Sequence, residues 1–433
     1  MNELDSEKIA GVLSDLGYSL TDSPDSADMI ILNTCSVREK AESKCYSDLG
    51  RLNELKKERP DLLIGVGGCV AQQEGTKIVK RAPYVDMVFG TDNISDIPGL
   101  LEKRGEKAKY RVSTERRRKR VLLQGNSIVK YTVLRNHSVK ALVNIVDGCD
   151  KFCTFCVVPF TRGRERSRKP EDICNEIRGL AASGYKEVTL LGQNVDSYGK
   201  DMGGGIDLAG LLEMISEIPG IERIRFMTSH PADFNNNLIT AIANLPKVCN
   251  HVHLPLQSGS DAMLDKMKRN YIYAEYKEKI AKLREAVPDV TITTDIIAGF
   301  PGESDADFNK TLKALEEIQY DAAYTFKYSK RPYTPARTYE AQVTIDVKKD
   351  RLNKVIELQN SITLAKNKEC EGKDFDILIE GESKRGSVSL TGRTRGNKIV
   401  HIPKQEGIHN GDIVHVRITF ATFSSLMGEV VGF

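Results

Sequence analysis

The chain has 433 residues, of which 40% are hydrophobic and 28% charged, and its formal net charge is +3. This composition is ordinary for a soluble globular protein, and the length allows two or three domains. No apolar run approaches the roughly 18 residues of a membrane span, and no basic-then-apolar leader opens the chain. We therefore expect a cytoplasmic protein with no membrane partner, in which any nucleic-acid binding depends on local basic patches.

Residues 1–110 alternate between helical and strand patterns. The first helix has Ile9, Val12 and Leu16 on its apolar face, with Asp5 or Ser6 as its expected N-cap. Such an order predicts an open, mostly parallel α/β sheet. The strands expected here are 29–32, 62–66 and 85–89, and the further helices are 38–57 and 96–103.

Two cysteines, Cys35 and Cys69, each follow the carboxyl end of a predicted strand. Parallel sheets place their ligands at that edge. Two buried small residues are the plain alternative, but the matching positions favour metal ligation. Cys45 lies on a predicted helix and is expected to be structural.

A basic linker is predicted over residues 111–133, with five basic residues, 116–120, at its centre. Such a run is more often solvated than bound to a ligand. In a protein that handles RNA it would favour phosphate contact.

From Lys140 onward the strand–helix alternation repeats about six times, as in successive βα units. Six parallel units predict an incomplete (β/α)6 barrel over residues 134–370, with its site at the carboxyl ends of the strands. The expected strands are 142–146, 187–191, 223–227, 251–254, 291–297 and 323–328.

Three cysteines, Cys149, Cys153 and Cys156, follow the first of these strands in the sequence GCDKFCTFC. No second cysteine pair lies nearby to complete a zinc site, because Cys174 falls within a predicted helix. Three thiolates leave one iron of a four-iron cluster without a protein ligand, and chemistry can occur there. A zinc knuckle or three unrelated core cysteines are the alternatives. Nine cysteines in this pattern suit a reducing compartment better than disulfides.

Polar or glycine residues follow the next four predicted strands. They are Gly192-Gln193-Asn194, Thr228-Ser229-His230-Pro231, Pro255 to Ser260 and Gly299 to Glu303. Each alone is a routine turn, but four around one opening indicate a binding mouth. His230 and His253 are at least as compatible with satisfied barrel histidines as with catalysis.

A long helix is predicted over 347–370, and the chain beyond it alternates between apolar and polar residues with many glycines. Five or so short strands, located in part at 376–380, 387–390, 413–418 and 428–431, predict a small all-β barrel of OB type over residues 371–433. The segment Gly392 to Lys398 within it is a basic hairpin, for which a solvated turn is the plain alternative.

These motifs together resemble the radical S-adenosylmethionine methylthiotransferase family. The cysteine loop resembles that of the radical SAM superfamily, segments 33–38, 67–72 and 90–92 resemble the family's amino-terminal domain, and Gly392 to Lys398 resembles a TRAM signature. The resemblance implies a 4Fe-4S cluster on Cys149, Cys153 and Cys156 that binds S-adenosyl-L-methionine. It also implies an auxiliary 4Fe-4S cluster that Cys35 and Cys69 help to hold. The residues implied to contact the cofactor are Phe155, Gln193, Ser229, Gln257, Arg269, Asp295 and Gly299.

The amino-terminal domain departs from the family pattern at its start. The family has an opening strand followed by its first cluster cysteine, whereas this chain begins with a helix, and the matching position would precede Met1. We expect Met1 to be an internal methionine or the chain to be truncated. If Met1 is the true start, at most two protein thiolates hold the auxiliary cluster.

The stretch after the cysteine loop, Val157 to Glu165, most resembles the family branch that acts on isopentenylated tRNA. That resemblance implies methylthiolation of carbon 2 of dimethylallyladenosine next to the anticodon, with sulfur from the auxiliary cluster. It also implies an electron donor such as flavodoxin or ferredoxin, and a system that supplies sulfur or clusters. The residues expected to contact RNA are Arg162, Arg164, Arg166, Arg168, Arg393 and Arg395.

Three alternatives to this function stay open at the level of sequence. Two belong to the same superfamily and act on threonylcarbamoyl-adenosine in tRNA or on an aspartate of a ribosomal protein. The third is a non-catalytic RNA-binding protein that contains a metal.

Overall fold

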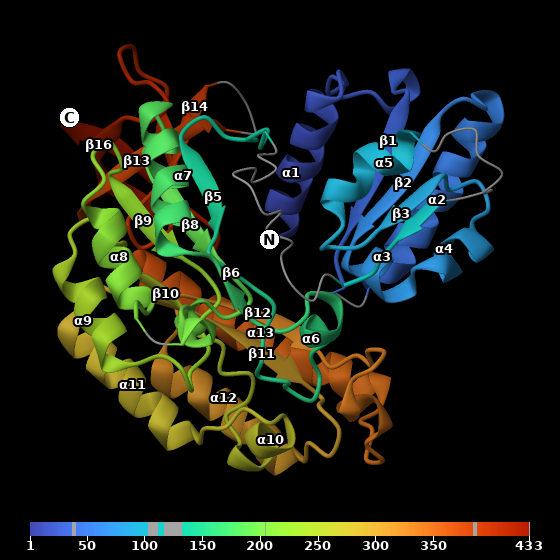
Figure 1. The fold of residues 1–433 in the computed structure, drawn as a ribbon. Coiled ribbons are helices and arrows are strands. Elements are labelled where there is room, and N and C mark those ends of the chain that lie inside the picture. The colour runs from blue at the N-terminus through green and yellow to red at the C-terminus, as the bar shows by residue number, and fades with distance from the viewer. Residues whose placement is uncertain (37–39, 103–110, 117–131, 204, 384–387, 433) are drawn as a thin grey trace. The chain divides into compact units, whose positions relative to one another are not determined.

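A computed structural model describes residues 1–36, 40–102, 111–116, 132–203, 205–383 and 388–432 (Figure 1). The chain forms two compact units. The first contains Met1–Asn136 together with Gly148–Asp150 and Val157–Arg164. The second contains His137–Asp147, Lys151–Cys156 and Glu165–Phe433.

The first unit is a parallel four-stranded sheet with helices on both faces (Figure 1). Ile64 and Val66 pack toward helix α2, whereas Phe89 packs with Ile9 of α1 on the other face. Strand β4 lies within the range predicted as linker, so the sheet extends beyond the predicted boundary. The strands are β1 (Met29–Thr34), β2 (Leu63–Gly68), β3 (Met87–Phe89) and β4 (Arg111–Ser113), and the helices are α1 (Asn2–Asp15), α2 (Lys40–Glu58), α3 (Cys69–Glu74), α4 (Thr76–Arg81), α5 (Ile97–Glu102) and α6 (Val158–Thr161).

The second unit begins with six parallel barrel strands in two three-stranded sheets, β5-β8-β9 and β10-β11-β12. An isolated parallel bridge pairs Ile224 of β9 with Val248, in the segment that precedes β10. This arrangement confirms the incomplete barrel. The strands are β5 (Lys140–Asn144), β8 (Glu187–Leu191), β9 (Arg223–Phe226), β10 (His251–His253), β11 (Thr291–Ala298) and β12 (Ala322–Lys327), and a short antiparallel pair, β6 (Val146–Asp147) with β7 (Arg166–Ser167), precedes the first barrel helix.

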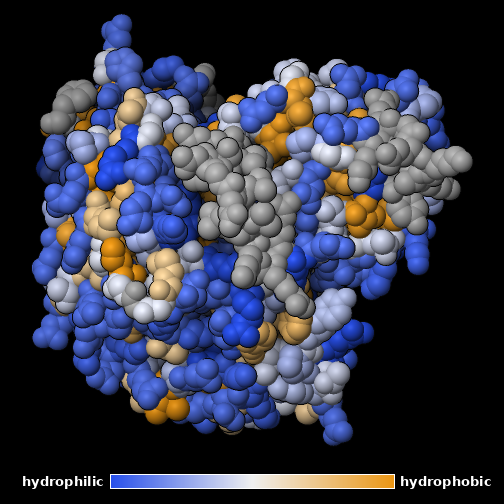
Figure 2. Space-filling view, viewed as in Figure 1, coloured by the Kyte–Doolittle hydropathy of each residue, from blue (hydrophilic) through white to orange (hydrophobic). Residues whose placement is uncertain are grey.

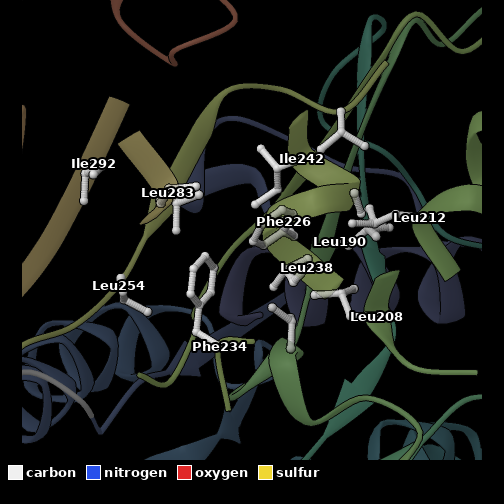
Figure 3. Close-up of a cluster of buried hydrophobic side chains, with 14 of the residues drawn as sticks. Leu190, Leu208, Leu212, Phe226, Phe234, Leu238, Ile242, Leu254, Leu283 and Ile292 are labelled. Atoms are coloured by element: carbon white, nitrogen blue, oxygen red, sulfur yellow. The ribbon is translucent and has the colours of Figure 1, made fainter. Parts of the chain in front are cut away.

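Helices cover the barrel strands through a continuous apolar core. Figure 3 shows Phe226 of β9 packed among Leu212 of α8 and Leu238 and Ile242 of α9. Burying each such side chain stabilises the fold by about 1.5–3 kcal/mol. The helices are α7 (Pro170–Ala182), α8 (Leu208–Ser216), α9 (Asn236–Asn244), α10 (Asp261–Lys266), α11 (Tyr273–Ala286) and α12 (Asp305–Ile318).

Helix α13 (Ile345–Lys368) leads from the barrel strands to a closed five-stranded barrel of order β13-β14-β15-β17-β16. Val414, Val416 and Ile418 alternate with exposed residues along β16, as a strand with one buried face requires. The OB-like prediction is confirmed, although β15 was not among the strands located from sequence. The strands are β13 (Asp374–Glu382), β14 (Ser389–Arg393), β15 (Ile399–Pro403), β16 (Ile413–Ala421) and β17 (Leu426–Gly432).

Apolar side chains at the surface are scattered. The face in Figure 2 is largely hydrophilic, with small separate hydrophobic patches, which is normal for a protein surface. Within the described ranges, every helix is too short or too polar to cross a bilayer.

Candidate active site and cysteine sites

The turn that carries Cys153 and Cys156 is fixed by Thr154, one of the two residues between them. Cys156 N–H donates to the Cys153 carbonyl at 2.9 Å. Thr154 donates through its backbone to Met267 O at 3.1 Å and through its hydroxyl to Lys266 O at 2.8 Å. Both acceptors lie at the end of α10, so this helix positions the cysteine turn.

Two backbone positions in the loop are unusual. Gly148 has φ +77°, and a Cβ there would lie 2.1 Å from the Arg164 carbonyl, so only glycine fits. Phe152, with φ +48°, has a left-handed backbone that is rare for a residue with a side chain. Strained conformations of this kind concentrate at functional sites.

Arg269 is the principal polar contact of Cys153. The guanidinium is buried, and its Nη1 donates to the Cys153 sulfur at 3.4 Å. Its Nη2 donates to the Pro255 carbonyl at 2.9 Å, and its Nε donates to the Tyr271 hydroxyl at 3.1 Å. Arg269, which was predicted to contact the cofactor, is therefore hydrogen-bonded to the cysteine loop.

Gln257 follows β10 with φ +71°, and its backbone bridges to β11. Its N–H donates to the Asp295 carbonyl at 2.8 Å, and its own carbonyl accepts from Ile297 N–H at 2.9 Å. The side-chain Oε1 is buried and meets no hydrogen-bond donor among the described residues. A buried acceptor of this kind is available to a ligand.

The other residues predicted to bind the cofactor lie at the same strand ends. Phe155 packs edge-on against Phe300, with ring centroids 6.4 Å apart. Gly299, at the end of β11 with φ +71°, donates its N–H to Glu303 Oε2 at 2.8 Å. Gln193 lies two residues after the end of β8, and Ser229 lies three residues after the end of β9.

Sequence reasoning missed a buried acidic group next to Ser229. Asp196 accepts from the Ser229 hydroxyl at 2.8 Å and from His230 N–H at 3.1 Å. Burial raises the pKa of Asp196 to about 7. Asp233 differs: burial alone would raise its pKa, but hydrogen bonds from Lys151, Lys200 and Asn194 lower the pKa of this carboxyl.

The two histidines weighed from sequence differ in the structure. His253 is satisfied, with Nδ1 3.0 Å from the Thr293 hydroxyl and Nε2 3.5 Å from Asp295. His230 accepts from Ala232 N–H through Nδ1 at 3.2 Å, which assigns the proton to Nε2. That buried Nε2 meets no acceptor in the described part of the chain. Burial lowers the pKa of His230, so a neutral imidazole presents one donor.

The three cysteines of the loop have the donor chemistry that an iron–sulfur cluster requires. All nine cysteines lie in the described ranges, and none of them forms a disulfide. The described residues include no group of three or more His, Cys, Asp or Glu placed around one metal ion. In a four-iron cluster each thiolate binds a different iron, so the sulfurs do not need to converge on one point.

Cys35 and Cys69, the other two cysteines predicted to bind a metal, both lie within the first unit. Thr34 and Gly68 are paired in the register of β1 and β2, so the two cysteines follow adjacent strand ends. The Thr34 hydroxyl accepts from Val70 N–H at 3.1 Å, which fixes the start of α3. Burial raises the pKa of the Cys69 thiol, and the positive charge of the Arg162 guanidinium partly opposes that shift.

Two of the arginines predicted to contact RNA are instead held within the protein. Arg162 is buried and paired with Asp5, which was expected to be a helix cap. Arg168 donates to Asn144 O and to Glu176, both at 2.7 Å. Arg164 is exposed and holds Asp150 through two nitrogens, at 2.6 and 3.0 Å. Arg166 lies half-buried on β7. Arg162 and Arg168 thus have partners within the protein, and their contact with RNA stays a prediction.

The hairpin Gly392 to Lys398 of the small barrel also makes contacts within the second unit. Arg395 donates to Val248 O at 2.7 Å, and Arg393 pairs with Glu380 at 3.2 Å. The carbonyls of this hairpin accept from Arg223 and Arg225, at the amino-terminal end of β9. Arg393 and Arg395 therefore contact other parts of their own unit, and their contact with RNA stays a prediction. The basic run 117–120 lies outside the described residues.

Solved structures share this fold at low identity. Two structures of a radical S-adenosylmethionine methyltransferase, TsrM, from Kitasatospora setae are similar to the chain with TM-scores of 0.55 and 0.54, each at 14% identity. The first, described with cobalamin and a 4Fe-4S cluster bound, covers 77% of this chain and 73% of that chain. The second covers 88% and 76%. The Radical SAM superfamily profile matches residues 143–315, which contain the three-cysteine loop. The fold and the loop thus define a radical SAM enzyme.

Matches over the whole chain define the family. Uncharacterized protein family UPF0004 matches residues 1–90, and the TRAM domain matches residues 368–431. A "tRNA-2-methylthio-N(6)-dimethylallyladenosine synthase" of Clostridium perfringens (strain SM101 / Type A) is 48% identical over 435 residues, covering 100% of this chain and 95% of the relative. The like-named protein of Thermoanaerobacter pseudethanolicus is 48% identical over 433 residues, covering 100% and 90%. The chain belongs to the tRNA-2-methylthio-N(6)-dimethylallyladenosine synthase family.

Proposed function

We propose that the chain transfers a methylthio group to carbon 2 of N(6)-dimethylallyladenosine in tRNA, next to the anticodon. The observation that carries this proposal is the 48% identity, over the whole chain, to relatives named for that product. Within the cytoplasm, its partners would be tRNA, an electron donor such as flavodoxin or ferredoxin, and a system that supplies sulfur or clusters.

Cys149, Cys153 and Cys156 would hold a 4Fe-4S cluster whose fourth iron takes S-adenosylmethionine. When bound, this pair of groups supplies radical chemistry that can activate an aromatic C–H bond, which has no proton acidic enough for a base to remove. Arg269 orients Cys153 through its hydrogen bond to the sulfur. Gln257 Oε1 and the His230 Nε2 proton offer one acceptor and one donor to a polar ligand.

Cys35 and Cys69 would contribute to an auxiliary 4Fe-4S cluster that provides the sulfur. Their thiols lie at adjacent strand ends, and the positive charge of Arg162 opposes the rise that burial causes in the pKa of Cys69. Thiolates next to arginine favour metal ligation.

Analysis of tRNA nucleosides from a strain that lacks the protein tests the proposal. The methylthio-isopentenyl form should disappear, while methylthiolated threonylcarbamoyl-adenosine and the ribosomal protein aspartate stay unchanged. Loss of either of the latter modifications instead would favour a sister activity.

Radical chemistry is tested separately with the purified, anaerobic protein. Reduced protein mixed with S-adenosylmethionine should release 5′-deoxyadenosine, and Cys153→Ala should abolish that release. A non-catalytic RNA-binding protein would release none, and zinc bound at the loop would point to the same alternative.

A further inference from the structure

We propose that Asp233 is a positioning residue for the three-cysteine loop: its buried carboxylate holds Lys151 and so fixes the segment of the loop that leads into Cys153. This inference rests on the proposed function, in which Cys153 is a ligand of the 4Fe-4S cluster. It gives a defined role to a carboxylate that the sequence did not single out.

The Asp233 carboxylate gathers donors from three segments of the second unit. Lys151 Nζ, in the cysteine loop, lies 2.7 Å from Oδ1 and 2.7 Å from Oδ2. Asn194 Nδ2, in the turn after β8, donates to Oδ2 at 2.6 Å, and Lys200 Nζ donates to Oδ1 at 2.6 Å. The side chain of Asp233 is 4% exposed, so these contacts are shielded from water and stronger than the same contacts at a surface.

The backbone that carries Asp233 is itself anchored to the barrel. Asp233 N–H donates to His230 O at 2.8 Å. Lys279 Nζ of α11 donates to Pro231 O at 2.6 Å and to Phe234 O at 2.8 Å. Phe234 is 1% exposed and packs within the barrel core (Figure 3). The carboxylate therefore projects from a fixed point, as a group that positions another side chain must.

The loop is anchored on both sides of Cys153. After Cys153, Thr154 is tied to the end of α10 by its backbone N–H and by its hydroxyl. Before Cys153, Phe152 has a backbone φ of +48°, which a residue with a side chain keeps only when its surroundings impose it. The contact with Asp233 holds Lys151, the residue just before Phe152. The two anchors therefore bracket Cys153 and the strained residue beside it.

The two lysines that contact Asp233 differ in what they can position. Lys151 belongs to the cysteine loop, and its side chain is 21% exposed. Lys200 lies outside the loop, and its side chain is 58% exposed. Loss of Lys200 should therefore leave the loop in place, whereas loss of Lys151 or of Asp233 should release it.

The expected effect follows from groups that support the ligands at other metal sites. Changing such a group typically costs about 10–100-fold in metal affinity. Asp233 acts on Cys153 through Lys151 and Phe152 rather than directly, so we expect the lower end of this range, about 10-fold.

The experiment uses the full chain with Cys35 and Cys69 changed to alanine, so that bound iron reports on the three-cysteine loop. After anaerobic reconstitution, the rate of iron release to a chelator is measured, together with iron and sulfide per chain. The EPR spectrum of the reduced cluster is recorded as a signature of ligand geometry, which a change in global stability alone would not alter. This parent is compared with its Asp233→Asn and Lys151→Met derivatives and with the double variant.

Two controls separate positioning from other effects. Lys200→Met removes another lysine from the same carboxylate without touching the loop. Asp233→Asn removes a negative charge and Lys151→Met a positive one, so a through-space effect of charge on the cluster would change the release rate in opposite directions. Loss of positioning accelerates release in both. Should Asp233→Asn fail to fold, Lys151→Met tests the same contact against Lys200→Met.

The inference is supported if Asp233→Asn and Lys151→Met each release iron about 10-fold faster than the parent and alter its EPR spectrum, while Lys200→Met matches the parent. The double variant should then release iron no faster than the faster single variant, because both changes break one contact. The inference is overturned if the two variants match the parent or change the rate in opposite directions, if their effects multiply in the double variant, or if Lys200→Met accelerates release as much. A parent that takes up no iron overturns the three-cysteine cluster of the proposed function, and the role of Asp233 with it.

Discussion

Replacing Arg225 by methionine should destabilise the second unit strongly, because this side chain joins the parallel strands to the small barrel. Its Nε lies 2.9 Å from Glu187 Oε2, and both side chains are 3% exposed. Its two terminal nitrogens donate to Arg395 O at 2.6 Å and Thr394 O at 2.7 Å. In the variant, the Glu187 carboxylate and the carbonyls of Thr394 and Arg395 stay buried and lose the arginine that contacts them.

The unpaired Glu187 carboxylate makes the largest contribution to the loss of stability in Arg225→Met. Removing one partner of a buried ion pair costs about 3–5 kcal/mol, and each carbonyl deprived of its donor adds about 1–3 kcal/mol, although these costs do not simply add. We expect Arg225→Met to lower the free energy of unfolding by about 4 kcal/mol. The double variant Glu187→Gln/Arg225→Met should cost less, since it removes the buried charge.

The chain contains no tryptophan, which makes a local probe simple to introduce. Phe375, partly buried against the core of the small barrel, can be changed to tryptophan in all variants. Urea titration followed by its fluorescence then reports on that barrel, and circular dichroism reports on the whole chain. The reasoning is refuted if Arg225→Met loses less than about 1 kcal/mol, or if the double variant costs more than the single one.

Two other predictions concern charge. Burial raises the pKa of Asp196 from 3.8 to about 7, a difference worth about 4 kcal/mol. The contribution of Asp196 to stability is therefore full below pH 3.8 and is lost as the pH rises through 7. Asp196→Asn should remove this dependence in unfolding titrations between pH 4 and 8, and an unchanged pH profile would contradict it. Arg164→Ala should weaken tRNA binding and reduce the slope of log binding constant against log salt concentration by about 1. Arg168→Ala removes an arginine that is held by Asn144 and Glu176, so it should leave that slope unchanged. Equal slopes for both variants would exclude a phosphate contact at Arg164.

The architecture was predictable because each element carries its own periodic signal. Strand β8 was located residue for residue from its apolar run, and the other five parallel barrel strands within a few residues. The neighbouring positions of Cys35 and Cys69 were predictable because each follows a strand, and parallel strands bring their carboxyl ends to one edge of the sheet. Strand β15 was missed because its five residues follow a basic hairpin with little apolar alternation.

Side-chain partners distant in sequence were not predictable. Aspartate is a common helix cap, yet α1 begins at Asn2, before Asp5. The Asp5 carboxylate binds Arg162 instead. Arg162 and Arg395 carry the same charge as exposed arginines, and only the fold reveals that one is buried and that the other donates to Val248. The neutral state of His230 likewise depends on burial by residues far along the chain.

The division of the chain has a practical consequence for anyone who expresses its parts separately. Val157–Arg164 belongs to the first unit although the sequence places it well after Asn136. A fragment cut at Asn136 would keep Asp5 and lose the guanidinium that neutralises it. Such a fragment would have to solvate that carboxylate or protonate it, so poor yield from it would say nothing about the intact enzyme.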